Sequence, residues 1–419
     1  MRAGVVDGSW LPRTARAIAH LMSQVTSREA EAMGRELMRL PYSRSSIERV
    51  GHAVGAEYLS RREQVEPKLI ETCELPPGVA SVSVSVDRVT VPMAYCATVT
   101  LHDVDGTALH TIRYGRMPAP VASVELLTHR EVHRMMDRLR EDVLTIRRRL
   151  GPIPVVLLAD GASEIWRLFS EHLNEKTLGL EPIRLVDAWH ALEYIAAAAR
   201  LLEVREQAWP GTFRRWKAWL LEEAGGAKRV FEALEKSGMR NARDATGNRP
   251  VGDALRYFQN RASLLHYAEA RFHGLPIGSG AVEATCKSLV SLRMKRCGAR
   301  WKHTSGNEIL QLRALQLSDR WDAAMPRVLS PLRKPVHVIT RGEALGRLAA
   351  NASLRAGIRG WQSAFSKQIS IVDLETNAYR NGRIGCAQSR NIQRLRIFRT
   401  TPRPVYIILL LRSVRVGAT

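Results

Sequence analysis

The spacing of apolar residues divides the chain into segments that predict different structures. In residues 1–75 the apolar positions recur at helical spacing, which predicts one helix over residues 27–38, capped by Ser27, and another over residues 43–59. A turn at residues 40–42 separates the two helices. Two helices around a short turn are typical of helix-turn-helix modules, and equally typical of other small helical modules. The pattern alone leaves the role of this segment open.

After Pro77 the pattern becomes that of a β-sheet. The segment SVSVSVDRVTV alternates valine with polar residues, as a half-buried strand does, and IPVVLL is an unbroken apolar run, as in central strands covered on both faces. Strands are predicted over residues 81–91, 95–102, 108–114, 153–158 and 182–186. Asp103, Asp105 and Gly106 predict a hairpin turn between the second and third strands.

The helices predicted around these strands decide the fold class. Helices are predicted over residues 121–150, from Ala162 onward and over 188–202, so three antiparallel strands are followed by strand, helix, strand and helix. This order predicts an α/β fold, a mixed sheet flanked by helices that is similar to the ribonuclease H fold. Residues 203–272 are charged, rich in tryptophan and without strand signal, which predicts an all-helical insertion before the last helix of that fold.

We therefore predict three parts: a helical region over residues 1–76, an α/β domain over 77–325, and a basic tail, irregular or disordered, over 326–419. The chain has 63 Lys and Arg against 41 Asp and Glu, a net charge of +22. The tail holds 17 of these basic residues and 3 of the acidic ones. Such an excess indicates a polyanionic partner, most often nucleic acid, although basic surface also serves solubility or attraction to membranes.

Composition also indicates the compartment. The five cysteines show no CxxC or Cys/His ligand spacing, which favours buried thiols in a reducing cytosol over a zinc site or disulfides. The first residues lack the apolar run of a secretory signal, and no apolar stretch is long enough to span a membrane. We expect a cytoplasmic protein without a membrane partner.

Three acidic residues are candidates for a metal site. Asp87 lies within the first predicted strand, Asp160 ends the central strand, and Glu283 lies on a helix that follows the sequence GSG. Open α/β sheets bind ligands at the carboxyl ends of their strands, and carboxylate oxygens suit Mg²⁺. Each residue also fits a purely structural role, respectively an outward-facing strand residue, a helix N-cap and a partner of Lys287 in an ion pair.

Asp187 and His190 form a second group, at the junction of the last strand with a helix. Residues three apart lie on one face of a helix, so the imidazole could serve as a hydrogen-bond partner near phosphates. A histidine packed at the start of a helix is the alternative.

The stretch around Glu283 is strongly basic. Apolar residues at helical spacing predict that this helix packs on a core: Val282, Cys286, Leu289 and Val290. The bases that follow the acid are Lys287, Arg293, Lys295, Arg296 and Arg300. We expect them to contact the phosphates of DNA, with an affinity that falls as salt rises.

Several phrases of the sequence resemble bacterial insertion-sequence transposases of the ISKra type, which are DDE transposases of the ribonuclease H-like superfamily. They are SVSVDRVTVPM, TVTLHDVDGTALHTIRYGRMP, LLADGASEIW, VDAWHALEYI and GLPIGSGAVEATCKSLVSLRMKRCGARW. The resemblance covers about residues 30–322, and its last phrase is highly specific. It implies a metal-dependent polynucleotidyl transferase that cleaves the ends of a mobile element and joins them to target DNA.

The resemblance also implies roles for individual residues. Asp87, Asp160 and Glu283 would be the catalytic ligands of Mg²⁺, with Mn²⁺ as the alternative ion, and Asp187 with His190 matches the D-x-x-H motif of several transposase groups. The expected partners are double-stranded DNA, at element ends and target, and further copies of the chain assembled on that DNA.

The N-terminal phrase LPYSRSSIERVGHAVG belongs, by the same resemblance, to a region that binds DNA. Arg44 and Arg49 are the expected DNA contacts in it.

Three features depart from the family. The N-terminal region is shorter, the chain passes almost directly from strand to strand between Val91 and Tyr95, and no family phrase follows Trp321. Our hypothesis is that the tail is translated element-end or flanking sequence. Two alternatives to an active transposase follow: a catalytically decayed, truncated copy that only binds DNA, and a ribonuclease H-like nuclease without strand transfer.

Overall fold

The computed structural model describes residues 4–6, 10–37, 43–90, 93–118, 124–203, 208–296 and 299–335. The described residues fall into two units, residues 4–6 with 334–335 and residues 10–333. In the first unit, β1 (Gly4–Val5) pairs antiparallel with β7 (Lys334–Pro335). The second unit contains the sheet and every candidate site residue.

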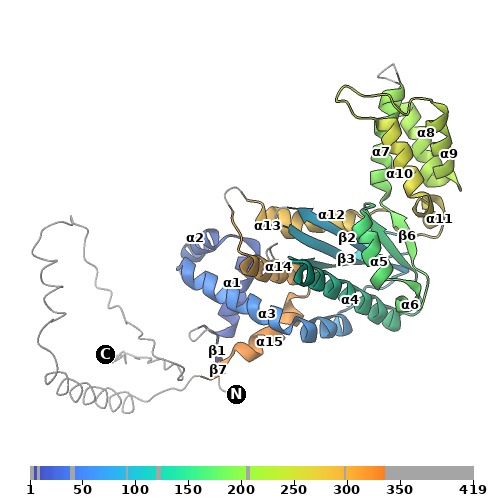
Figure 1. Ribbon diagram of the computed structural model, residues 1–419. Coiled ribbons are helices and arrows are strands. Elements are labelled where there is room, and N and C mark those ends of the chain that lie inside the picture. Colours follow the sequence, from blue (N-terminus) through green and yellow to red (C-terminus); the bar gives the residue numbers. More distant parts are fainter. Residues whose placement is uncertain are drawn as a thin grey trace, which may run out of the picture. The chain divides into compact units, whose positions relative to one another are not determined.

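A five-stranded mixed sheet lies at the centre of the second unit (Figure 1). Its strands are β2 (Ser81–Thr90), β3 (Met93–His102), β4 (Ala108–Arg116), β5 (Val155–Ala159) and β6 (Ile183–Val186). They lie in the order β4-β3-β2-β5-β6, with β3 antiparallel to β2 and β4, and β5 parallel to β2 and β6. The five predicted strands are confirmed, each within two residues at either end.

Helices cover the sheet and precede and follow it. Before the sheet lie α1 (Pro12–Gln24), α2 (Ser27–Leu37) and α3 (Arg44–Thr72), and between its strands lie α4 (Val124–Leu150), α5 (Ser163–His172) and α6 (Glu175–Leu178). After β6 come α7 (Ala188–Leu202), α8 (Trp209–Glu222), α9 (Gly226–Lys236), α10 (Pro250–Asn260), a 3₁₀ helix (Ala262–Leu264) and α11 (Tyr267–Phe272). The last helices are α12 (Gly280–Thr285), a π-helix (Cys286–Ser291), α13 (Leu292–Met294), α14 (His303–Leu317) and α15 (Trp321–Leu332). The fold is therefore mixed α/β, as predicted.

The alternation in β2 sorts its residues between two cores. Val84 and its even-numbered neighbours join the helices α4 and α5 in one core. Val89, on the opposite face, joins α12, the π-helix and α14 in another. Asp87 lies two residues from Val89, so it shares the face covered by α12. The sequence had left this direction open.

The segment from α7 to α11 contains no strand among its described residues, in agreement with the predicted all-helical insertion. Its helices share a core with one face of β5 and β6, in which Trp216, Leu220 and Phe258 are buried. This core explains the tryptophan content of the segment, since large aromatic side chains supply much buried area in a small helical bundle.

Two predicted boundaries near the ends of this unit differ from the structure. The helix predicted over residues 43–59 continues as α3 through Pro67 to Thr72, because Val65 and Leu69 are buried on both sides of the proline. The turn predicted at residues 40–42 lies outside the described residues. At the other end α15 runs past Pro326 to Leu332, so the first residues of the predicted irregular tail are helical.

The remainder of the predicted tail, from residue 336, lies outside the described residues. Within the parts that are described, no helix combines the length and apolar character needed to cross a membrane.

A buried ion pair connects α3 with the edge of the sheet. Arg116, at the end of β4, has 2% of its side chain exposed, and its Nη2 lies 3.2 Å from Oε1 of Glu66 on α3. Its Nη1 donates to the amide oxygen of Gln311 on α14 at 2.8 Å. Burial lowers the pKa of Arg116, and the Glu66 carboxylate opposes this effect. Loss of one partner would leave the other charge buried without compensation.

We expect Glu66→Ala to lower the free energy of unfolding by about 3–5 kcal/mol, because it leaves the Arg116 guanidinium buried and unpaired. A urea titration followed by circular dichroism measures the change. The matched control is Glu71→Ala, an exposed acid on the same helix, which we expect to change stability by less than about 0.5 kcal/mol. Equal stability of the two variants would show that the ion pair does not support the fold.

Candidate functional site

Three aspartates lie at one level across three neighbouring strands. The register pairs Ser85 of β2 with Leu158 of β5, so Asp87 and Asp160 each lie two residues beyond that pair. It also pairs Ala159 of β5 with Val186 of β6, so Asp160 and Asp187 each follow directly. Parallel neighbours are about 4.8 Å apart. The fold therefore gathers acids that are 73 and 27 positions apart in the sequence.

Asp87 is half-buried beneath the helix that carries Glu283. Its Oδ1 accepts a hydrogen bond from the backbone N–H of Arg88 at 2.6 Å, and its Oδ2 accepts one from Sγ of Cys286 at 3.3 Å. A hydrogen bond with Cys96 and burial raise the pKa of Cys286, which keeps that thiol protonated as a donor. Asp87 is thus directed toward the π-helix rather than outward from the sheet.

Asp160 is exposed at the end of β5, and its Oδ1 accepts the backbone N–H of Ala162 at 3.0 Å. The residue that caps α5 is Ala162, so Asp160 does not occupy the N-cap. Gly161 has a φ of 98°, and a Cβ there would come within 2.3 Å of Nε of Arg261. The positive φ favours glycine at this turn, and any other residue would also have to displace the guanidinium of Arg261.

Glu283 lies on α12 with 53% of its side chain exposed. Burial raises its pKa, and the negative charges of Asp187 and Asp87 raise it further. Glu283 therefore lies within electrostatic reach of both Asp187 and Asp87. Packing against the sheet holds α12 and the π-helix that follows it. Val282 of α12 and Leu289 and Val290 of the π-helix are buried, as the helical spacing predicted.

Asp187 ties the end of β6 to the loop before α12. None of its side chain is exposed, although it is an acid. Its Oδ1 accepts the backbone N–H groups of Trp189, at 2.6 Å, and His190, at 3.3 Å. Its Oδ2 accepts both the backbone N–H and the hydroxyl of Ser279. With four donors around it, this carboxylate is built to hold α7 and α12 in place.

His190 lies between two carboxylates on the exposed side of this junction. Its Nε2 is 3.7 Å from Oε1 of Glu283, and its Nδ1 is 3.3 Å from Oε2 of Glu193. About a third of its side chain, 35%, is exposed. The exposed part of the ring can orient Glu283 or meet a ligand.

The structure separates the predicted DNA-binding bases into buried and exposed groups. Arg293 was predicted to contact phosphate, but its side chain is buried and donates to the carbonyl of Met22, so this prediction is wrong. Burial lowers its pKa to about 10. Arg296 is partly engaged, with Nη1 at 2.6 Å from both carboxylate oxygens of Glu29. Lys287, Lys295 and Arg300 are exposed.

The bases predicted on α3 are also exposed. Arg44 bonds through its Nε to Glu48 and to the hydroxyl of Ser27, both at 2.9 Å, and Arg49 lies one turn further along the helix.

Two residues near the acids were not recognised from the sequence. Glu164 on α5 accepts from the Arg88 guanidinium at 3.0 Å and from the hydroxyl of Tyr95, and so joins α5 to the strands beside Asp87. Trp189 is 60% exposed, with Nζ of Lys217 5.7 Å from its ring centroid. An exposed aromatic ring next to a cation is a surface for base stacking. Both residues lie in sequence phrases that carry the family resemblance. Their place in these phrases was the one sequence feature that could have identified them.

The donor set at this site suits a hard divalent cation. Carboxylate oxygens, which Asp87, Asp160 and Glu283 supply, are the ligands that Mg²⁺ prefers, and two of the three residues, Asp160 and Glu283, are exposed to solvent. Burial raises the pKa of Glu283, and the charges of Asp187 and Asp87 raise it further; a bound cation would offset the repulsion between these carboxylates. Comparison of the chain with known proteins identifies no relative: no family model, no curated protein and no solved structure matches it.

We expect Ser279→Ala to lower the free energy of unfolding by about 1.5–3 kcal/mol, because the buried Asp187 loses a hydrogen bond to a charged acceptor. Thermal and urea unfolding measure this change. The control, Ser263→Ala, alters an exposed serine of the nearby 3₁₀ helix and should be within about 0.5 kcal/mol of the unmodified protein. If both serine variants are equally stable, Asp187 does not depend on Ser279.

Proposed function

We propose that the protein is a DNA transposase with a ribonuclease H-like catalytic fold, which cleaves the ends of a mobile element and transfers the strands to target DNA. The observation that supports the proposal is the placement of three acids on one face of the sheet. Asp87 and Asp160 lie at one level on neighbouring parallel strands, and α12 brings Glu283 over the same face. The mixed sheet, with the strand order β4-β3-β2-β5-β6 and helices flanking it, is consistent with that fold.

In this proposal Asp87, Asp160 and Glu283 hold the metal ions. A pair of bound Mg²⁺ ions would supply Lewis-acid stabilisation of the transferring phosphate and a water or 3′-hydroxyl of increased nucleophilicity. His190 orients the Glu283 carboxylate through the contact at 3.7 Å, or binds a phosphate oxygen when it is protonated. Asp187 acts indirectly, since its four hydrogen bonds fix the position of α12.

Exposed bases beside the acids would hold the DNA. Lys287 lies four residues after Glu283, and Lys295 and Arg300 follow in the same stretch. The ammonium and guanidinium groups of this stretch would contact phosphates along the DNA backbone. The expected assembly is a homo-oligomer on double-stranded DNA, because two ends of an element must be joined together.

The two alternatives differ from the transposase in the reaction products that they would form. A nuclease of the same fold would use the same three acids for hydrolysis and would form no strand-transfer product. A decayed copy would bind DNA through the bases and cut nothing.

The direct test uses DNA that flanks the gene as the source of element ends, with labelled 3′-ends and Mg²⁺. We expect cleaved ends that become covalently joined to target DNA. Glu283→Gln should reduce the cleavage rate at least about 1,000-fold, a barrier increase of about 4 kcal/mol, because it removes one metal-ligand charge. Asp87→Asn and Asp160→Asn should have effects of the same order.

The control for these variants is Glu232→Gln, an exposed acid on α9, which should cleave at the normal rate. Full activity of Glu283→Gln would contradict the assignment of the metal ligands. Cleavage without joined products would favour the nuclease, and DNA binding without cleavage would favour the decayed copy.

The bases give a separate prediction about binding. For Lys287→Gln we expect weaker DNA binding, and a plot of log affinity against log salt whose slope is smaller in magnitude by about 1, because one phosphate contact is lost. Fluorescence anisotropy of labelled duplex DNA at several salt concentrations measures the slope. Lys236→Gln, at an exposed position on α9, is the matched control and should leave the slope unchanged. Identical slopes for both variants would remove Lys287 from the DNA interface.

A further inference from the structure

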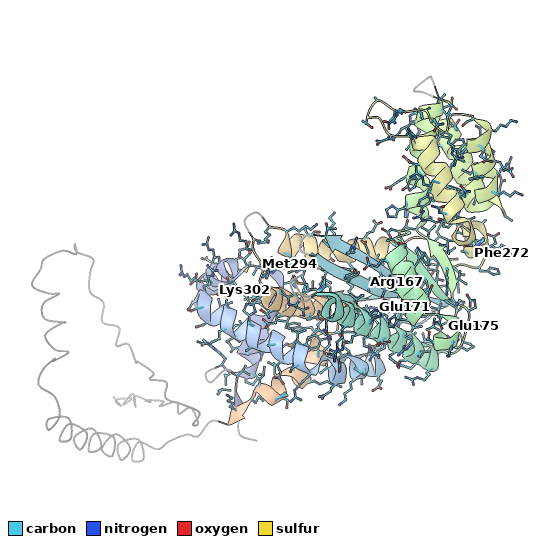
Figure 2. All side chains as sticks on the ribbon, in the orientation of Figure 1. Arg167, Glu171, Glu175, Phe272, Met294 and Lys302 are labelled. Carbon is cyan, nitrogen blue, oxygen red and sulfur yellow. The ribbon has the colours of Figure 1, made fainter. Side chains whose placement is uncertain are left out.

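A second group of metal-ligand side chains lies on the opposite face of the sheet, where α4 packs against α5. His133 on α4 and Glu171 with His172 at the end of α5 bring one ligand atom each within 4.8 Å of one another. Figure 2 labels Glu171 on α5, with Arg167 one turn before it. No part of the proposed DNA chemistry uses these residues.

The contact between the two imidazoles marks the position of the ion. Nδ1 of His133 lies 2.6 Å from Nε2 of His172, so one of the two nitrogens carries a proton directed at the other. A metal ion needs both nitrogens deprotonated and binds where that proton lies. Two nitrogens bound to a tetrahedral zinc at 2.0–2.1 Å are about 3.4 Å apart. The observed separations from Nδ1 of His133, 2.6 Å to His172 and 3.8 Å to Glu171, lie on either side of this value.

The ring of His172 is already oriented for such a role. Its Nδ1 is 3.0 Å from Oδ1 of Asp137, one turn along α4 from His133. A carboxylate at this nitrogen fixes the Nδ1–H tautomer and leaves Nε2 available as a ligand, the arrangement found around metal-bound histidines. His172 is also largely buried, with 13% of its side chain exposed, so its position is held by packing.

The kinds of ligand atom at this site indicate which metal ion it would bind. Two imidazoles and one carboxylate suit zinc and neighbouring transition metals, whereas Mg²⁺ prefers oxygen ligands and keeps its waters. The histidines come from two helices, so a bound ion would cross-link α4 to the end of α5.

We infer that His133, Glu171 and His172 bind one Zn²⁺ ion, with a water molecule as the fourth ligand and with Asp137 positioning His172. This inference does not depend on the proposed DNA chemistry. The ion has a structural role, since it fixes α5, whose other end holds Glu164 against Arg88 and Tyr95.

Calorimetric titration of the full chain, stripped of metals with a chelator, with zinc chloride tests the inference. We expect one site per chain that MgCl₂ does not compete for, and a visible absorption band of tetrahedral geometry when Co²⁺ replaces Zn²⁺. Affinity should fall as the pH is lowered, because protonated imidazoles cannot bind the ion. His172→Gln should abolish this site, and Asp137→Asn should weaken it about 10–100-fold.

Two controls distinguish this site from other binding. His273→Gln removes an exposed histidine elsewhere in the unit and should leave the affinity unchanged. Asp87→Asn alters the proposed catalytic site and should also leave it unchanged, so failure of either proposal is seen separately. Circular dichroism establishes that each variant is folded. If His172→Gln does not fold, Asp137→Asn decides, since Asp137 is half-exposed.

The inference is overturned if the unmodified chain binds no zinc, or binds it with an affinity that neither His172→Gln nor Asp137→Asn reduces. In that case the two histidines form only a hydrogen bond between α4 and α5.

Discussion

The buried carboxylate of Asp187 is the interaction on which the candidate site depends. It accepts two hydrogen bonds from the start of α7 and two from Ser279, 92 positions later in the chain. A further bond, from the N–H of Ala188 to the carbonyl of Ile277, strengthens the same junction. The chain leaves the sheet at β6, forms the helices α7–α11 and returns at this point. Asp187 therefore determines where α12 begins, and hence where Glu283 lies over the sheet.

This arrangement keeps carboxylates together in spite of their repulsion. The pKa of Glu283 is raised by burial and by the charges of Asp187 and Asp87, so the site is less stable than an uncharged one would be. Packing offsets the cost, because Val282 and Leu289 are buried against the sheet. An unfavourable local arrangement, such as carboxylates held close together, that is offset by surrounding packing is typical of functional sites.

Helix α5 connects the two sites that we propose. Glu164, near its start, contacts Arg88 and Tyr95 beside Asp87. Burial and the Glu164 carboxylate raise the pKa of Tyr95 to about 12, against the opposing effect of the Arg88 guanidinium. His172 lies at the other end, eight residues or about 12 Å further along the helix. An ion bound there would restrict the motion of the helix that supports the strand of Asp87.

The sequence by itself determined the five strands and the all-helical character of residues 188–202 and 208–272, because hydrophobic period is a local property that neighbouring residues express together. It could not determine which face Asp87 occupies, that Arg293 donates to a carbonyl 271 positions away, or that His133 meets His172. The family resemblance named the acids, yet the common level of Asp87, Asp160 and Asp187 follows only from the register of three strands. Tertiary structure decided these points, since each depends on how distant segments pack and not on the pattern within any one of them.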